Sequence, residues 1–210
     1  MILYQTTEST TMPLGLKETK QHLRLATAIT AEDDLLSAYI RTAYQYAENM
    51  CEMSIVPHTW VLKLNGFPGS TGHIDLPMCR PMSTSASPVV VKFLLDDTVT
   101  TGTTYTLAAT RYVVSTFSDP PKLYPSYGNE WPSSVRTDPH EGNVIITYNA
   151  GYATLNASMV DVPADIKSWL KIRVADMYEN RQALQVKGGV APLPRSYVDG
   201  ILDRYKVGRL

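Results

Sequence analysis

One long amphipathic segment near the C-terminal end constrains the fold of this chain more than any other feature. Residues 162–185 read VPADIKSWLKIRVADMYENRQALQ, and neither Gly nor Pro interrupts them between Pro163 and Gly188. Pro163 suits the first position of a helix, where its missing N–H costs nothing, and Asp165 complements the positive end of the helix dipole. Apolar residues recur at helical spacing and form one wide stripe: Ile166, Trp169, Leu170, Val174, Met177 and Tyr178. A helix with so broad an apolar face needs a second layer of structure to cover it.

The partner layer is predicted at the opposite end of the chain. Residues 16–25 have the pattern of a short amphipathic helix. Thr30 is a suitable N-cap, and Asp33 three residues later completes a pair that resembles a capping box. The helix that follows is expected to reach about Glu52, with its apolar face made by Leu36, Tyr39, Ile40, Ala43, Ala47 and Met50. The helices of both ends should therefore share a bundle core that contains Leu36, Ile40, Ile166, Trp169, Leu170, Val174 and Met177.

Between these helices the apolar pattern changes to the alternation typical of strands. Strands are predicted near residues 60–64, 73–76, 89–95, 112–117 and 143–149, and turn signals separate them too often for crossover helices. Residues 1–13 are expected to form an extended arm, and residues 119–139 a proline-rich loop held by aromatic side chains. The predicted fold class is α+β: a helical bundle formed by the N- and C-terminal helices, with an inserted antiparallel β-rich module. The expected parts are residues 1–54, 55–160 and 161–210.

Composition and charge exclude several classes of protein. Charged residues make up 19% and hydrophobic residues 44% of the 210 residues, as in a folded protein. The net charge of −1 predicts no bulk attraction to nucleic acid, although residues 163–210 carry nine Lys or Arg against five Asp or Glu. Cys51 and Cys79 have no metal-ligand spacing and form no disulfide framework, so a reducing compartment is expected. The N-terminus lacks the pattern of a signal peptide, and no apolar run is long enough to span a membrane.

A search for catalytic, metal or cofactor chemistry finds no convincing pattern. The four histidines are scattered, and the paired carboxylates at residues 33–34 and 96–97 are explained by a helix start and a hairpin turn. Gly188 and Gly189 follow a helix, so they do not form a phosphate-binding loop. Four aromatic residues of the middle module fall at strand positions: Trp60, Phe93, Tyr112 and Tyr148. At such positions packing in a core or in a contact between subunits is favoured over a surface on which sugars or bases stack. We expect neither an enzyme nor a bound cofactor or metal, and a carbohydrate-binding module stays open as an alternative.

The order of motifs along the whole chain resembles the head–tail connector, or head-completion adaptor, proteins of tailed bacteriophages and gene transfer agents. LGLKETKQHLRL and the acidic AEDDLLSAYIRTAYQYAE resemble the opening helices of that family. TWVLKLNGFPG and HIDLPMCRP are similar to its strands, and NEWP and VIITYNAGY follow in the same order. VPADIKSWLKIRVADMYENRQAL resembles the family's "V-P-x-x-I-K … Y-E-N-R" helix, and LDRYKVGRL its C-terminal ending. Two departures are Lys206 at the position of a frequent Arg and the looser LLDDTVTTG after the sheet strand.

This resemblance implies a structural virion protein. Such adaptors assemble as a ring, typically of twelve copies, beneath the portal protein at the capsid vertex. The ring extends the DNA channel, through which packaged DNA passes without sequence-specific binding, and offers a docking surface to a tail, stopper or tail-terminator protein. The implied place is the neck of the virion, after assembly in the host cytoplasm and without a membrane. Another neck or tail-completion protein with the same arrangement is the alternative within this class.

The C-terminal segment, residues 196–210, is the predicted portal-docking element. Ile201, Leu202 and Tyr205 lie on one side of a short helix, and that side is too small to be a core but suits a groove. Surrounding positive charge favours an acidic partner surface. The alternative is a frayed chain end. The expected portal-binding residues are Tyr197, Ile201, Leu202, Arg204, Tyr205, Lys206 and Arg209.

Overall fold

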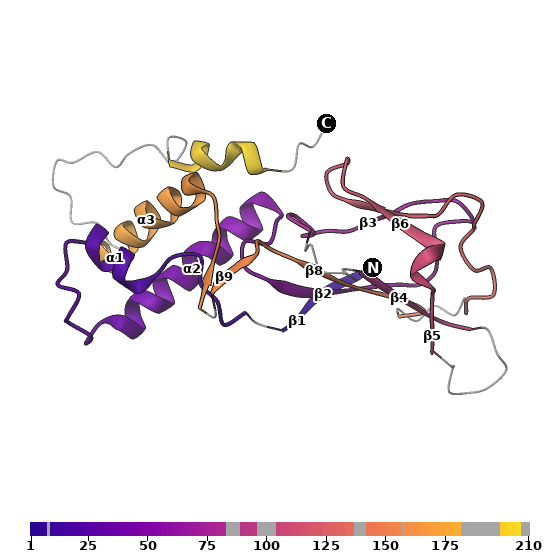
Figure 1. Cartoon of the computed structure of the whole chain (residues 1–210), viewed down its shortest axis with the longest axis horizontal. Coiled ribbons are helices and arrows are strands. Elements are labelled where there is room, and N and C mark those ends of the chain that lie inside the picture. Colours follow the sequence, from indigo (N-terminus) through magenta and orange to yellow (C-terminus); the bar gives the residue numbers. More distant parts are fainter. Residues whose placement is uncertain are drawn as a thin grey trace. The chain divides into compact units, whose positions relative to one another are not determined.

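The computed structural model describes residues 1–7, 9–82, 89–95, 104–136, 142–156, 158–181 and 198–206 (Figure 1). The chain divides into two compact units. A β unit contains Met1–Ser9 and Pro57–Gly151, and a helical unit contains Thr10–Val56 and Tyr152–Val207. Each unit has its own cluster of buried apolar side chains.

The larger sheet of the β unit has five strands in the order β1-β2-β8-β4-β5, and each strand is antiparallel to its neighbours. The strands are β1 (Ile2–Thr7), β2 (His58–Leu64), β4 (Val89–Leu94), β5 (Thr104–Thr106) and β8 (Val144–Ala150). Alternate residues of the central strands turn to one face, because successive side chains of a strand point to opposite sides. That face forms most of the core of the unit, from Leu62, Val89, Val91, Phe93, Val144, Ile146 and Tyr148.

A smaller antiparallel sheet in the order β3-β7-β6 contributes to the same core. Its strands are β3 (Ile74–Asp75), β6 (Tyr112–Ser115) and β7 (Lys122–Pro125), and the short 3-10 helix η1 (Ala109–Arg111) precedes β6. Trp131 also belongs to this core: its ring stacks on Phe67 at 4.8 Å, and its Nε1 donates a hydrogen bond of 2.6 Å to the carbonyl of Gly72. The indole therefore buries its surface without leaving its N–H unpaired.

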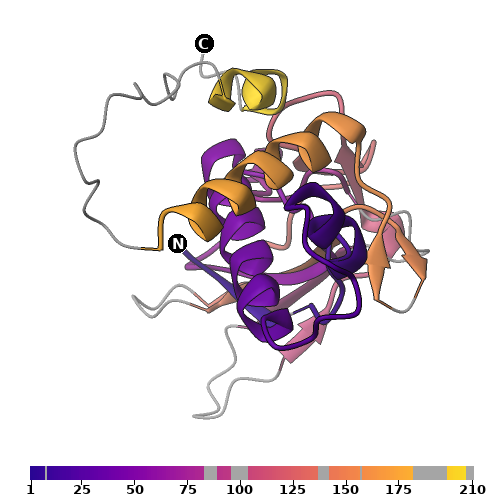
Figure 2. The same ribbon diagram turned by 90° about the vertical axis from the view of Figure 1, so that its left-hand side faces the viewer.

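In its described residues, the helical unit contains three α-helices, a 3-10 helix and a small two-stranded sheet (Figure 2). The bounds are α1 (Leu16–His22), α2 (Asp33–Cys51), α3 (Ala164–Glu179), η2 (Gly200–Tyr205), β9 (Thr154–Asn156) and β10 (Met159–Val160). One core joins residues from both ends of the chain: Ile40, Ala43, Tyr44 and Ala47 of α2 with Ile166, Trp169, Leu170 and Val174 of α3. Leu36 is also fully buried, and Met177 packs against the core while partly exposed.

Side-chain contacts join the three helices, and hydrogen bonds stabilise the chain just after the C-terminal end of α2. The rings of Tyr46 on α2 and Trp169 on α3 stack with centroids 6.1 Å apart. Lys171 of α3 reaches Glu18 of α1 in a 2.6 Å ion pair. After α2, the backbone turns at Glu52, which has a φ of 51°. The buried carboxylate of Glu48 then accepts hydrogen bonds from the backbone N–H groups of residues 55 and 56.

The α+β class with antiparallel sheets is confirmed, while several local predictions were wrong. The long C-terminal helix ends at Glu179 instead of continuing to about residue 185, and α1 ends at His22. Residues 2–7 are a paired sheet strand where an arm was expected. β7 lies in the expected loop, and β9 and β10 were not predicted. The expected turn at residues 96–97 and break at residues 187–194 lie outside the described residues.

Candidate functional site

The C-terminal segment packs on the helical core of its own chain. Leu202 has 1% of its surface exposed and belongs to that core, and Ile201 and Tyr205 pack against it while partly buried. The prediction that this apolar side is free of the core was therefore wrong. It failed because the sequence pattern could not show that α2 and α3 pack against this segment. Tyr197 and Arg209, the two outer members of the predicted docking set, lie outside the described residues.

Three polar contacts fix the same segment to α3. The Tyr205 hydroxyl lies 2.8 Å and 2.9 Å from the two carboxylate oxygens of Asp165, to which it can donate its one proton. Arg204 pairs with the same carboxylate at 3.2 Å. The Trp169 Nε1 donates to Asp199 Oδ1 at 3.2 Å. Burial, followed by the hydrogen bond to Asp165, raises the pKa of Tyr205 to about 12. Asp165 therefore anchors the segment, a role that its place in the first turn of a helix did not indicate.

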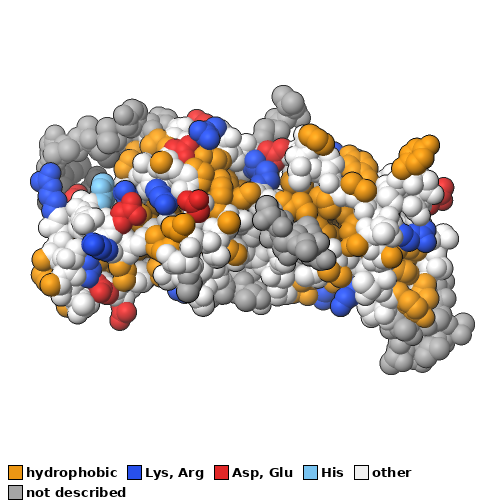
Figure 3. Space-filling view, in the orientation of Figure 1, with side chains coloured by type: hydrophobic (Ala, Val, Ile, Leu, Met, Phe, Trp, Pro, Cys, Tyr) orange, Lys and Arg blue, Asp and Glu red, His pale blue; other side chains and the backbone are white. Residues whose placement is uncertain are grey.

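Most described cations of the C-terminal part have acidic partners within the chain. Lys171 pairs with Glu18, Arg181 with Glu32, and Lys206 with Asp203. On the visible face of the helical unit, Lys and Arg side chains lie beside Asp and Glu (Figure 3). Carboxylates of the N-terminal helices and of the C-terminal part itself thus neutralise much of the net positive charge of residues 163–210. The Arg204 side chain remains 71% exposed although it pairs with Asp165.

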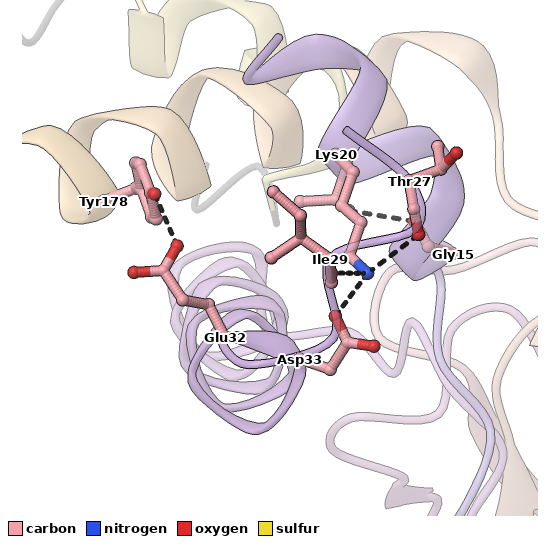
Figure 4. Close-up of polar contacts among 8 residues, drawn as sticks. Gly15, Lys20, Thr27, Ile29, Glu32, Asp33 and Tyr178 are labelled. Carbon is pink, nitrogen blue, oxygen red and sulfur yellow. Dashed lines mark hydrogen bonds and ion pairs between the residues drawn. The ribbon is translucent and has the colours of Figure 1, made fainter. Parts of the chain in front are cut away.

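A buried lysine closes the loop between α1 and α2 (Figure 4). The Lys20 side chain is 6% exposed, and its ammonium group lies 2.5 Å from Asp33 Oδ1. The same group donates to the carbonyl oxygens of Ile29 at 2.6 Å and Thr27 at 3.4 Å. A buried charge is tolerated only when paired and hydrogen-bonded, as here. The capping box predicted from Thr30 and Asp33 was wrong: no side chain caps α2, and Asp33 binds Lys20 instead.

A second cluster joins the N-terminal end of α2 to the C-terminal end of α3 (Figure 4). The Tyr178 hydroxyl donates to Glu32 Oε2 at 2.6 Å, and Arg181 donates to Glu32 Oε1 at 2.8 Å. The Arg181 guanidinium also lies over the Tyr178 ring, 4.7 Å from its centroid. The hydrogen bond from Tyr178, and then that from Arg181, lowers the pKa of Glu32. The YENR motif that carries the family resemblance thus forms part of the contact between the two long helices.

The described residues offer no constellation for metal binding, since none of their His, Cys, Asp and Glu side chains form a group of three or more that could hold an ion. His58 is buried beside Gln5, with 2.8 Å between His58 Nδ1 and Gln5 Nε2, and His140 lies outside the described residues. Two members of the possible aromatic platform, Phe93 and Tyr148, are buried in the core. No helix in the described part of the chain is long and apolar enough to cross a membrane.

Comparison with known families and structures gives one family match and several similar folds. The model of the "Phage gp6-like head-tail connector protein" family matches residues 14–77, which include α1, α2, β2 and β3. None of the curated proteins compared with the chain matches it.

Among the solved structures with a similar fold are particles of a gene transfer agent (GTA). A chain of "Neck of empty GTA particle computed with C6 symmetry" has a TM-score of 0.71 and 22% identity, and a chain of "Neck of native GTA particle computed with C12 symmetry" has 0.65 and 20%. A chain of "Virion of native gene transfer agent (GTA) particle" has 0.64 and 21%. Each alignment covers 100% of this chain and 97% of the other. The resemblance to phage head–tail connector proteins drawn from the sequence is therefore confirmed.

Proposed function

We propose that this protein is a structural component of the neck of a tailed virion or a virion-like particle. It assembles with copies of itself into a ring beneath the portal protein, where it extends the DNA channel. The family resemblance implies twelve copies in that ring. The observation that carries this proposal is the fit of the whole chain, 100% of its length, to neck chains of nearly equal length. The family match of residues 14–77 supports the same function independently of the fold comparison.

Within this proposal the helical bundle of the two chain ends and its C-terminal segment meet the portal. The contact cannot use the Leu202 side of η2, because α3 already covers it. The exposed side of η2 is the proposed docking surface, and Arg204 is its charged centre because its side chain is 71% exposed. The β unit then binds a tail, stopper or tail-terminator protein. DNA passes through the channel without sequence-specific contacts, and no catalytic step is assigned to the protein.

Deletion of the gene tests the function directly. Particles made without the protein should be DNA-filled heads that lack tails, and expression of the intact chain from a plasmid should restore tailed particles. Electron micrographs and a count of infectious or gene-transferring particles measure both. Normal numbers of tailed, active particles after deletion would contradict the proposal.

Arg204→Glu tests the docking surface separately. This substitution leaves the buried Leu202 in place and should reduce recovery of the portal protein in co-purification at least tenfold. Lys92→Glu, an exposed charge reversal on β4 of the other unit, is the matched control and should leave recovery unchanged. Equal recovery with both variants would remove Arg204 from the portal contact.

A further inference from the structure

The two edge strands of the five-stranded sheet have side chains suited to a further strand. β1 and β5 each have one strand neighbour in the described sheet and are its two edge strands. Large apolar side chains remain exposed on both: Ile2 at 46%, Tyr4 at 39% and Tyr105 at 44%. Soluble proteins usually protect a sheet edge with charged residues, proline or bulges. Neither strand contains a charged residue or a proline, and the register irregularity of β1 lies at residues 5–7, beyond Ile2–Tyr4.

The regular part of the β1 edge is long enough to pair with all of β5, and the two edges agree in face. The register of β1 against β2 is regular from Ile2 to Gln5 and shifts between Gln5 and Thr7. β5 has three residues, Thr104–Thr106, and Ile2–Tyr4 offers three regular residues to oppose them. Leu3 pairs with buried Leu62 and Tyr105 pairs with buried Phe93, so both middle residues lie on the core face. Their flanking residues lie on the opposite face.

Strand direction selects how two copies of the chain join at these edges. Every step from β1 through β2, β8 and β4 to β5 is antiparallel, so β1 and β5 run in the same direction. A rotation of 30° or 60° between neighbours of a twelve- or six-fold ring roughly preserves that direction. β5 of one copy therefore meets β1 of the next as a parallel pair. Because the two edges differ, this contact is heterologous, and with such a rotation between neighbours it closes into a ring.

We propose that Thr104–Thr106 of each copy pairs in parallel with Ile2–Tyr4 of a second copy, which joins the sheets into a continuous belt around the ring. Leu3 then lies beside Tyr105 and extends the apolar face of the core, and Thr106 lies beside Tyr4 on the other face. This pairing rests on the proposed function, because that function supplies the cyclic assembly. A three-residue ladder is weak by itself. The belt therefore forms in the assembled neck, and the dilute free chain stays largely unpaired.

Cysteine cross-linking in purified particles tests this pairing. Tyr4→Cys and Thr106→Cys in one chain place two exposed thiols on the same face at the proposed contact, within reach of a disulfide or a short bismaleimide. The native Cys51 and Cys79 are buried and do not compete. A non-reducing gel should show a ladder of covalent oligomers that ends at the ring size, while each single variant stays monomeric. Tyr4→Cys with Val113→Cys, an exposed position on β6, is the matched control and should give no ladder.

Two results would overturn the pairing while leaving the proposed function intact. One is the absence of a ladder in particles that contain the normal amount of the protein at the neck. The other is a covalent dimer from Tyr4→Cys alone, because two β1 edges meet antiparallel about a two-fold axis and stop at two copies. Absence of the protein from wild-type particles is a different failure: it contradicts the neck function itself.

Discussion

Replacing Leu202 by Ala should lower the free energy of unfolding by about 2–5 kcal/mol, the range for large-to-small substitutions in a packed core. Leu202 is 1% exposed and lies in the core formed by α2 and α3. The contacts of Tyr205 and Trp169 hold the segment in position on both sides of Leu202, so the site has little freedom to collapse around the missing atoms. The upper half of the range is therefore expected.

Urea titration followed by far-UV circular dichroism and tryptophan fluorescence measures this loss. Arg204→Ala is the matched control in the same segment, because a largely exposed ion pair contributes at most about 1 kcal/mol. A truncation before residue 198 removes every one of these contacts and should destabilise the protein at least as much as Leu202→Ala. If Leu202→Ala costs less than about 1 kcal/mol, the segment does not pack on α3, and the packing account of the C-terminal segment is wrong.

Three further predictions test other parts of the structure. Glu48→Ala leaves two buried backbone N–H groups without their acceptor and should lower the free energy of unfolding by about 2–6 kcal/mol in denaturant titration. Glu48→Gln keeps an acceptor oxygen and should lower it clearly less, so equal losses would contradict this role of Glu48. Glu32 has a pKa below its ordinary value of 4.5, so its contribution to stability is present above that value and is lost as the pH falls below it. Thermal midpoints of Glu32→Gln should therefore fall less steeply in acid than those of the wild type, and parallel curves would contradict this. Burial raises the pKa of Cys79 to about 12, so mass spectrometry should find no alkylation of Cys79 by iodoacetamide in the native protein at pH 8; rapid labelling would show that the core is open.

The long helices were predictable because their apolar spacing is a local property of the sequence. Ile166, Trp169, Leu170 and Val174 recur at helical intervals, and the structure buries all four. The strands around Val61, Val91 and Ile146 were predictable from β-branched residues and frequent turns. In these segments local preference and burial agree, so the pattern alone indicates the structure.

The remaining features depend on residues far apart in the sequence. Residues 2–7 have the Thr-rich pattern of an arm, and they become a strand because β2, more than fifty residues later, offers an edge. Asp33 would suit a capping box, but Lys20 of another helix binds its carboxylate. Asp165 would suit a helix dipole, but Tyr205 and Arg204 approach it from the C-terminal segment. A sequence shows that each of these groups is polar, and only the fold decides which partner reaches it.

The neck function is tested most directly by electron cryomicroscopy of the neck of purified particles, reconstructed at sufficient resolution to trace side chains. The expected result is a ring of copies of this chain beneath the portal protein, around a central channel and with the symmetry of the portal. A neck density that fits a different chain in this position, or a single copy of this chain at the vertex, would contradict it.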